Sequence, residues 1–468
     1  MKFLLFGTGD YYNRYRKWFE QQEIVALLDN SEQKQHTYID GVKVLSPKEG
    51  IRLKYDIIVI LSFYVKQMKQ QLVSLGADES RIFHFYDLHQ LLLGRTVKRT
   101  LQYFLRAKEI IEGNNTSKAK VLLMSHDLTL GGPAIALFHA AMVFKKHDYE
   151  VVYSSMIDGP LRTKLVENDI SVVVDENLQL ATMNETDWVK SFSLIVCNTL
   201  NFHVFLSERD TSVPVVWWFH DARFFYNGVN KNVMGKINLN NLKAVSVGPV
   251  PAEAIGEFLP EISCGQLLYG VGDVQSGIRQ DKNVHETICF ITIGFLEDIK
   301  GQDVLLKAIK MLSAKIRHMC KFYIVGHNMT LFGEKVKKTA LDISEVIFTG
   351  SVSRKEIHKL LNEADVLICP SRQDSMPTVA AEAMMHSVPC ILSNVIGTSV
   401  YINDGEDGFI FKNEDAEALA EKISWCVENK KDMEEMGRKA RSIYEEHFSM
   451  PVFENNLLKI VNEVLDSK

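Results

Sequence analysis

Long apolar runs alternate with amphipathic stretches along most of the chain, and the runs fall into three groups. Stretches between them, such as residues 10–22 and 134–147, have the spacing of helices. Strands that are covered on both faces read as unbroken apolar runs, so the pattern predicts parallel sheets packed between helices, an α/β fold. The runs that predict strands lie at 2–6, 24–30 and 56–62, then at 121–125, 151–155, 194–198, 215–219 and 244–247, and finally at 288–294, 321–326, 346–350, 365–371 and 389–394.

The three groups of strands predict three domains. A chain of 468 residues is long enough for about three domains of roughly 100–200 residues each. The first group predicts a small Rossmann-like module, and the two larger groups predict two facing Rossmann-like domains with a cleft between them. We expect the module at 1–94, a linker helix at 95–118, domains at 119–275 and 276–450, and a final helix at 451–468.

Residues 95–112 combine an apolar side with several lysines and arginines, which predicts an amphipathic helix, and residues 113–120 read as a linker. A basic amphipathic helix can lie on an anionic membrane, so one interpretation is a peripheral membrane contact. The other interpretation is a connecting helix with a solvated face. No apolar run approaches the ~18–20 residues that a membrane-spanning helix needs.

Composition narrows the cellular setting. The net charge is −6 and the pI is near 6.2, so the overall charge gives no reason to expect a nucleic-acid partner. Seven cysteines are scattered without a C-x-x-C pair, which favours reduced thiols over a disulfide framework. The apolar start meets a glycine turn too soon for a secretory signal. We therefore expect a cytoplasmic protein, and since no His, Asp or Cys cluster has metal-ligand spacing, we expect no metal.

The N-terminal module begins like a dinucleotide-binding unit. Gly7 and Gly9 form a turn between a strand and a helix, and Asp29 ends the next strand, twenty residues after Gly9. Tyr12 stands where such a motif has its third glycine. Two interpretations stay open: a nucleotide site, in which Asp29 binds a ribose, and a purely structural start of a βαβ unit.

Two further turns carry groups that suit a diphosphate. Gly131 and Gly132 follow the run 121–125 and precede a helix, so backbone N–H groups can approach a phosphate there. Lys300 lies at a junction between a loop and a helix after the run 288–294. Alone, each signal is weak, because many strand–helix turns contain glycine and most lysines are simply solvated.

The segment 369–394 carries the strongest signal, two carboxylates in an α/β turn. Asp374 lies in a polar loop after a strand, and Glu382 lies in a helix that is otherwise apolar. A carboxylate in such a helix costs free energy unless it is hydrogen-bonded. Its partner could be a ligand, such as ribose hydroxyls, or a backbone group or basic residue of the protein.

From about residue 119 to the C-terminus, these motifs resemble the family 4 glycosyltransferases, which have the two-domain GT-B fold. The family carries an E-(seven residues)-E motif after P-S, which here stands as Asp374 and Glu382 after Pro370-Ser371. Its K-G-x-x-x-L motif matches the segment that starts at Lys300. The final helix resembles the family's terminal helix, which crosses back to the first of the two domains.

Further matches lie in both domains. Gly131-Gly132 match the family's glycine pair, and His220 in VVWWFHD matches its histidine after an apolar strand. The segment 397–408, which begins with Gly397-Thr398, resembles the family's segment near the nucleotide. Two departures stand out: Asp replaces the first Glu of the motif, and an arginine often found after a glycine is absent. Arg372 is our candidate to replace that phosphate contact.

The resemblance implies a role for each of these residues. Asp374 would contact the donor sugar together with His220, and Glu382 would bind the ribose of a UDP- or GDP-sugar. Lys300 would neutralise the diphosphate, with the Gly132 amide helping to hold it. The reaction would retain the anomeric configuration and need neither a protein nucleophile nor a metal.

The predicted function is therefore sugar transfer to a glycan or lipid-linked acceptor in surface-polysaccharide synthesis. The N-terminal module resembles small Rossmann-like modules that accompany such enzymes. One alternative is an NAD-dependent sugar-nucleotide oxidoreductase or epimerase centred on the module, although neither Tyr11 nor Tyr15 has a lysine at the spacing of a proton relay. The other alternative is a sugar-nucleotide-binding scaffold with weak catalysis.

Overall fold

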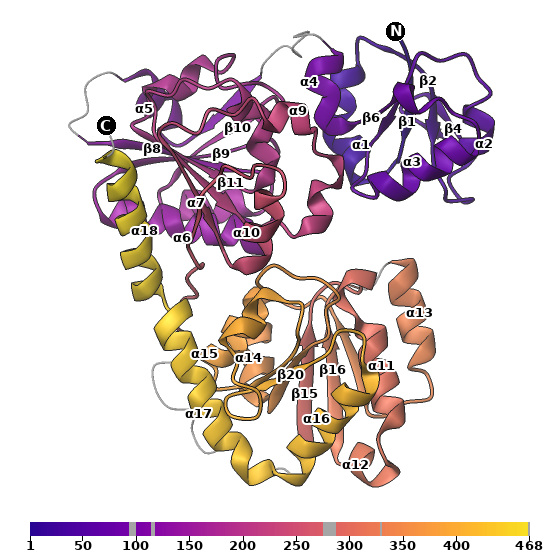
Figure 1. The fold of residues 1–468 in the computed structure, drawn as a ribbon, viewed down its shortest axis with the longest axis vertical. Helices are drawn as coiled ribbons and strands as arrows, with labels where there is room; N and C mark the ends of the chain where they lie inside the picture. Colours follow the sequence, from indigo (N-terminus) through magenta and orange to yellow (C-terminus); the bar gives the residue numbers. More distant parts are fainter. Residues whose placement is uncertain (93–99, 114–117, 275–286, 328–329, 467–468) are drawn as a thin grey trace. The chain divides into compact units, whose positions relative to one another are not determined.

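The computed structural model describes residues 1–92, 100–113, 118–274, 287–327 and 330–466, which form two compact units (Figure 1). Unit 1 comprises Met1–Val245, Glu253–Gly265 and Val461–Lys468, and unit 2 comprises Ser246–Ala252 and Gln266–Ile460. Each unit is described by itself below.

The first sheet of unit 1 belongs to the N-terminal module. It has six strands in the order β3-β4-β2-β1-β5-β6, parallel except for the hairpin of β3 with β4. The apolar runs at 2–6, 24–30 and 56–62 form its centre, as predicted. The strands are β1 (Lys2–Phe6), β2 (Glu23–Leu28), β3 (Tyr38–Ile39), β4 (Val42–Leu45), β5 (Ile57–Ile60) and β6 (Ile82–His84), and the helices are α1 (Asp10–Tyr15), α2 (Pro47–Gly50), α3 (Val65–Ser74) and α4 (Leu88–Leu91).

The second sheet has eight strands in the order β14-β13-β12-β11-β8-β9-β10-β7. Strands β8 to β12 pair in parallel and are buried along their length, which explains their unbroken apolar sequences. The strands are β7 (Leu101–Phe104), β8 (Lys120–Ser125), β9 (Glu150–Ser155), β10 (Ser171–Asp175), β11 (Leu194–Asn198), β12 (Val215–Phe219), β13 (Leu242–Ser246) and β14 (Cys264–Gln266), and the helices are α5 (Ala107–Glu112), α6 (Gly132–Lys146), α7 (Leu161–Glu167), α8 (His203–Ser207), α9 (Lys231–Met234) and α10 (Pro249–Gly256).

The expected helix over residues 95–112 is wrong for its middle part. Residues 93–99 lie outside the described residues, β7 is a strand that pairs antiparallel with β10, and only α5 is helical. The pairing supplies hydrogen-bond partners for the edge of the apolar strand β10, a long-range gain that outweighs the local helical spacing. The described part of the segment thus does not form the predicted basic amphipathic helix, and a peripheral membrane contact stays a prediction. None of the described helices has both the length and the apolar character needed to cross a bilayer.

Unit 2 is built on a third sheet, of six parallel strands in the order β17-β16-β15-β18-β19-β20. All five predicted strands of this region are present. The strands are β15 (Ile288–Ile293), β16 (Cys320–Val325), β17 (Val346–Gly350), β18 (Val366–Cys369), β19 (Cys390–Ser393) and β20 (Phe409–Phe411), and the helices are α11 (Gln302–Met311), α12 (Ala314–His318), α13 (Leu331–Thr339), α14 (Arg354–Glu363), α15 (Thr378–Met385), α16 (Ala416–Glu428), α17 (Met433–Ile443) and α18 (Met450–Leu465).

The final helix α18 belongs to both units, because residues up to Ile460 are assigned to unit 2 and residues from Val461 to unit 1. Within unit 1, Lys243 Nζ lies 2.9 Å from Glu463 Oε2. The helix predicted at 451–468 therefore contributes to the compact unit that contains the second sheet.

The N-terminal module and the second sheet share one apolar core. Phe85 and Tyr86 of the module are almost fully buried in the same cluster as Trp217 of β12. The Tyr86 hydroxyl donates a hydrogen bond to Asn201, and the Asn230 side-chain amide donates one to Asp87 over 3.1 Å. Because a cluster of this kind excludes water from both sides, the module is an integral part of unit 1.

Replacing Phe85 with alanine should destabilise unit 1 by about 3–5 kcal/mol, the cost of removing a fully buried phenyl ring. The ring lies 4.6 Å from the ring of Tyr15 and 5.0 Å from that of Tyr11, so its loss leaves a cavity among aromatic side chains. Thermal unfolding of the full chain checks this result. Tyr38→Ala is the control, since Tyr38 is 68% exposed and should change little; equal effects of the two variants would contradict a shared core.

Candidate active site

Lys300 and Asp374 meet at the carboxyl ends of β15 and β18 in unit 2. Lys300 ends the turn that follows β15, and Asp374 lies in the loop after β18. Lys300 Nζ donates a hydrogen bond to Asp374 Oδ2 over 2.6 Å, and the two side chains are 32% and 15% exposed. The carboxylate raises the pKa of Lys300 above its ordinary value, against the opposing effect of burial. The lysine is therefore a positive charge held in place beside the partly exposed loop that carries Asp374.

Gly301 is required for this arrangement. Its φ is +67°, in the left-handed region, and a Cβ on it would lie 2.0 Å from the carbonyl oxygen of Pro370. Only glycine allows the turn before α11 to approach the end of β18 so closely. The K-G motif thus has a direct physical basis: the glycine brings the lysine against the loop that holds Asp374.

Glu382 lies on α15, the helix that follows the Asp374 loop, and its side chain is 2% exposed. Arg354, the first residue of α14, donates hydrogen bonds to both carboxylate oxygens of Glu382. Burial raises the pKa of Glu382, and the charge of Arg354 opposes that rise. Among the partners that the sequence left open for Glu382, the structure shows a basic residue of the protein. Sequence patterning missed Arg354, because nothing in the local sequence links it to a helix 28 residues away.

Gly397 and Thr398 lie beneath the Asp374 loop. The Gly397 amide donates a hydrogen bond to the Asp374 carbonyl over 3.1 Å, and a Cβ on Gly397 would lie 1.8 Å from the Ser375 carbonyl oxygen. The Thr398 hydroxyl is buried and donates to the sulfur of Met376 over 3.2 Å. Their direct contacts support the loop; a contact of either residue with a nucleotide stays a prediction.

Arg372 forms ion pairs with carboxylates of unit 2. It donates two hydrogen bonds of 2.9 Å to the carboxylate of Asp303 and one of 2.6 Å to Glu414. These partners raise the pKa of the guanidinium, Asp303 most of all. The two carboxylates occupy the N–H donors of the guanidinium and offset its positive charge. The geometry therefore disfavours the predicted phosphate contact.

In unit 1, the predicted residues lie at the carboxyl edge of the second sheet. Gly131 precedes α6, which starts at Gly132, and its amide donates to the Thr129 hydroxyl over 3.3 Å. His220 follows β12, with its ring 4.6 Å from that of Trp218. Burial lowers the pKa of His220 to about 3, so its imidazole is neutral at physiological pH. Its Nε2 is buried and has no hydrogen-bond partner among the described residues, which leaves it available for a ligand.

His126 and Asp127 are functional candidates that sequence reasoning missed. They follow β8 in the tripeptide S-H-D, just as His220 follows β12 in F-H-D, and this repeat was the available signal. His126 Nε2 lies 3.4 Å from Asp127 Oδ2, and the charge of His126 contributes to the lowered pKa of His220. Asp221, next to His220, has a pKa raised by burial to about 6, and accepts a hydrogen bond from the Leu200 amide. Two histidines and two carboxyl groups therefore gather at this edge.

At the N-terminal turn, the carboxylate of Asp29 is hydrogen-bonded to neighbouring groups of the module. Gly7 has a φ of +109°, and a Cβ on it would lie 2.8 Å from the Leu61 carbonyl oxygen, so the glycine is required by the backbone. Asp29 accepts hydrogen bonds from the amide and hydroxyl of Thr8 and from the Ser31 amide. A Cβ on Gly9 would meet no neighbour within 4 Å. These contacts favour the structural interpretation, and the nucleotide site at Gly7, Gly9 and Asp29 stays a prediction.

Three stretches of the chain match models of known protein families. Residues 275–443 match the family model described as glycosyl transferases group 1, residues 117–246 match glycosyl-transferase family 4, and residues 1–83 match the family C2185-like, N-terminal. A protein of the cps region of Klebsiella pneumoniae is 34% identical over 29% of this chain and 36% of its own length. The capsular polysaccharide biosynthesis glycosyltransferase CapM of Staphylococcus aureus is 25% identical over 37% of this chain and 45% of its own length. Both matches thus span less than half of the relative.

Solved structures give the fold of the larger part of the chain. The crystal structure of HepE from Anabaena in complex with UDP-glucose superposes with a TM-score of 0.62, covering 74% of this chain and 99% of that one at 17% sequence identity. Identity at this level establishes the fold, GT-B, and not the substrate. The two larger parts of the chain thus each match a glycosyltransferase family model, family 4 at residues 117–246 and group 1 at residues 275–443. The predicted fold and family are confirmed.

Replacing Arg354 with alanine should leave Glu382 buried without its counterion and raise its pKa further. Breaking a fully buried pair costs about 3–5 kcal/mol. Because the Arg354 side chain is 54% exposed and screened by water, we expect about 1–2 kcal/mol. Because the pKa of Glu382 is raised in the folded state, the folded variant loses stability as the pH rises through that pKa. The loss in free energy of unfolding relative to the wild type should therefore be small near pH 4.5, the ordinary pKa of Glu, and largest at neutral pH.

Thermal unfolding of this variant at both pH values measures the effect. Lys355→Ala is the matched control, since Lys355 is the next residue of α14 and is exposed. A deficit in Arg354→Ala that does not change with pH would contradict the ion pair as the cause.

Proposed function

We propose that this glycosyltransferase moves a hexose from a UDP- or GDP-sugar to a glycan or lipid-linked acceptor, in the synthesis of a surface polysaccharide. The observation that carries the proposal is the pair of Lys300 and Asp374 at the carboxyl edge of the third sheet, followed by α15 with its buried Glu382. Open parallel sheets bind their ligands at this edge. A cation for the diphosphate and carboxylates for the sugar and ribose hydroxyls are groups that a nucleotide sugar requires.

Each residue has a separate task in the proposed reaction. Glu382 accepts hydrogen bonds from the ribose hydroxyls, with Arg354 moving away from at least one carboxylate oxygen as the nucleotide enters. Lys300 exchanges its contact with Asp374 for the diphosphate, and Asp374 then accepts hydrogen bonds from the sugar hydroxyls. The ion pair would keep both groups ordered before the donor binds, which lowers the cost of forming the site.

The proposed reaction retains the anomeric configuration. The bond from the anomeric carbon to the β-phosphate oxygen breaks, and the acceptor oxygen bonds to the same face of the sugar. The acceptor proton passes to the departing phosphate oxygen, and the nucleoside diphosphate leaves. Positive charge from Lys300 and helix N-termini, including α6 after Gly131, stabilises the departing diphosphate. The protein supplies no nucleophile, and the proposal needs no metal. His220, held neutral by burial, would contact the donor sugar.

The biological setting is inferred from relatives. CapM is named for capsular polysaccharide biosynthesis, and the Klebsiella relative for a cps region. The Anabaena protein was solved with UDP-glucose. By analogy, the acceptor would be a growing surface glycan, and the enzyme would act in the cytoplasm with at most a peripheral contact with the membrane. No finding supports the oxidoreductase or epimerase alternative. Asp29, the residue expected to bind a ribose in that alternative, accepts hydrogen bonds from Thr8 and Ser31 of its own loop region.

Glu382→Gln should lower kcat/KM for the donor roughly 10–100-fold, the cost of losing a charged hydrogen-bond acceptor. Release of nucleoside diphosphate from a panel of UDP- and GDP-sugars, measured in the presence of EDTA, reports the activity. Glu421→Gln, an exposed glutamate on α16, is the control and should leave the rate unchanged. Wild-type turnover by a folded Glu382→Gln variant would overturn the proposed donor site, and loss of wild-type activity in EDTA would overturn metal independence.

The anomeric configuration of the product provides a second test. NMR of the glycoside formed from a UDP-α-sugar or GDP-α-sugar should show the α-configuration in the first product to appear. A β-linked first product would contradict retention and would require a general base, for which the neutral His220 would then be the first candidate.

A further inference from the structure

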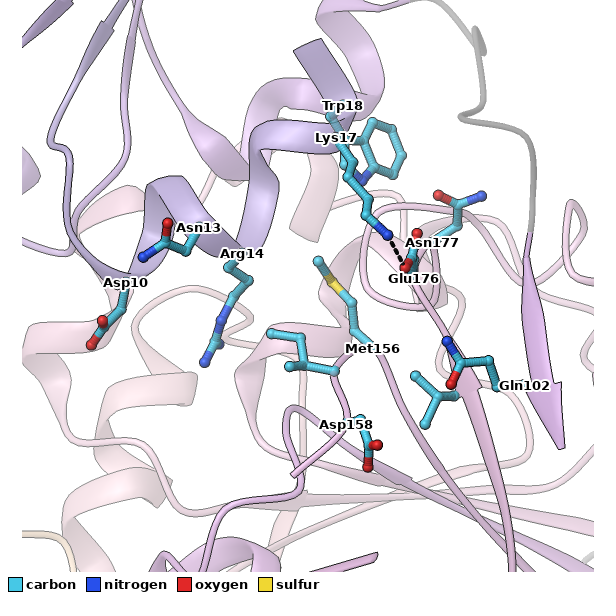
Figure 2. Close-up of a pocket in the computed structure, with 12 residues that line it drawn as sticks. Asp10, Asn13, Arg14, Lys17, Trp18, Gln102, Met156, Asp158, Glu176 and Asn177 are labelled. Carbon is cyan, nitrogen blue, oxygen red and sulfur yellow. Dashed lines mark hydrogen bonds and ion pairs between the residues drawn. The ribbon is translucent and has the colours of Figure 1, made fainter. Parts of the chain in front are cut away.

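A pocket of about 360 Å³ lies within unit 1, between α1 of the N-terminal module and the second sheet (Figure 2). One wall carries Asn13, Arg14 and Lys17 of the module, and the other carries residues that follow β9 and β10, among them Asp158 and Glu176. Its volume is at the lower end of the range of about 300–1,000 Å³ for ligand pockets. The pocket is lined by residues of both the module and the second sheet.

The position of the pocket is the one where α/β sheets bind ligands. The segments after β9 and β10 lie at the carboxyl edge of the sheet, the edge that also carries His126 and His220. Arg14 connects the two places: it lines the pocket, and its guanidinium lies 3.6 Å from the carboxylate of Asp127. An ion pair between Lys17 and Glu176 fixes the module to the sheet across the pocket (Figure 2). The pocket is therefore held in place from both walls.

The lining has the composition of a carbohydrate site. Trp18, Met156 and Val174 line the pocket and are at most 5% exposed, so they form its apolar base. Around it stand the exposed side chains of Asn13 and Gln102, which have no side-chain hydrogen bond to any described residue. Amide groups both donate and accept, as sugar hydroxyls do, and a mostly apolar base with a few polar groups around it is typical of small-molecule sites.

The charge balance argues against a nucleotide in this pocket. Two of the lining side chains are cationic, Arg14 and Lys17, and three are acidic, Asp10, Asp158 and Glu176, which leaves a net charge of −1. Each cation also has a carboxylate beside it. A diphosphate would enter a site with surplus negative charge, whereas a neutral sugar would not.

We propose that this pocket binds a neutral sugar unit of the glycan acceptor, so that the N-terminal module takes part in choosing the acceptor. The acceptor role rests on the proposed transferase activity; the binding of a saccharide does not. The module thus supplies one wall of a substrate site, which explains why it shares a core with the glycosyltransferase domain.

The experiment uses the full chain and methyl glycosides of glucose, galactose, N-acetylglucosamine and rhamnose at millimolar concentration, with UDP and GDP added to block the donor site. Saturation-transfer NMR measures binding to the wild type, to Gln102→Trp and Asn13→Trp, which fill the pocket from opposite walls, and to Gln70→Trp. Gln70 is exposed on α3 and does not line the pocket. At least one glycoside should bind, with affinity reduced about tenfold or more in both filling variants and unchanged in Gln70→Trp.

Several results would overturn the proposal: no glycoside binds the wild type, both filling variants bind like the wild type, or UDP and GDP abolish all binding, which would place the sugar in the donor site only. Binding of UDP and GDP to the wild type is measured separately by calorimetry. If neither nucleotide binds while a glycoside does, the proposed function fails and the saccharide pocket stands.

Discussion

The close approach of Gly301 to the Pro370 carbonyl is the contact on which the site in unit 2 depends. A side chain at residue 301 would collide with the end of β18, and the positive φ of the turn would be strained. With glycine there, Lys300 meets Asp374, and the Asp374 loop in turn rests on Gly397, a second position where no Cβ fits. Two glycines thus bring together side chains that are 74 residues apart. Backbone packing at these two glycines thus arranges the loop that holds Asp374.

The N-terminal module of unit 1 shares its apolar core with the second sheet. A module joined by a flexible linker would be separable, but here Phe85 and Tyr86 are buried in the core that also contains Trp217. The linker region itself contributes the edge strand β7 to the second sheet. Arg14 of the module lies beside Asp127, at the edge that carries His220. The module is therefore a structural part of unit 1 and reaches the carboxyl edge of its second sheet.

The sequence predicted the positions of most strands along the chain, because a buried parallel strand has an unbroken apolar pattern that can be recognised without knowing its neighbours. It failed at β7, where Leu101–Phe104 take a strand conformation only because β10 offers an edge to pair with. It also could not identify the partner of Glu382, since Arg354 lies on another helix. Arg372, chosen for its charge, is held by carboxylates that only the fold brings together. Motifs identified the candidate residues, whereas their ion pairs could be found only from the structure.

The central claim is that Lys300, Asp374 and Glu382 form the donor site. The most direct test is an experimental structure of the full chain with UDP or GDP bound. The account predicts the ribose hydroxyls on the Glu382 carboxylate, Arg354 displaced from at least one of its oxygens, and the diphosphate within hydrogen-bond distance of Lys300 Nζ. A nucleotide bound at Gly7–Gly9, or one in unit 2 with the contact between Arg354 and Glu382 unchanged and Lys300 still on Asp374, would contradict it.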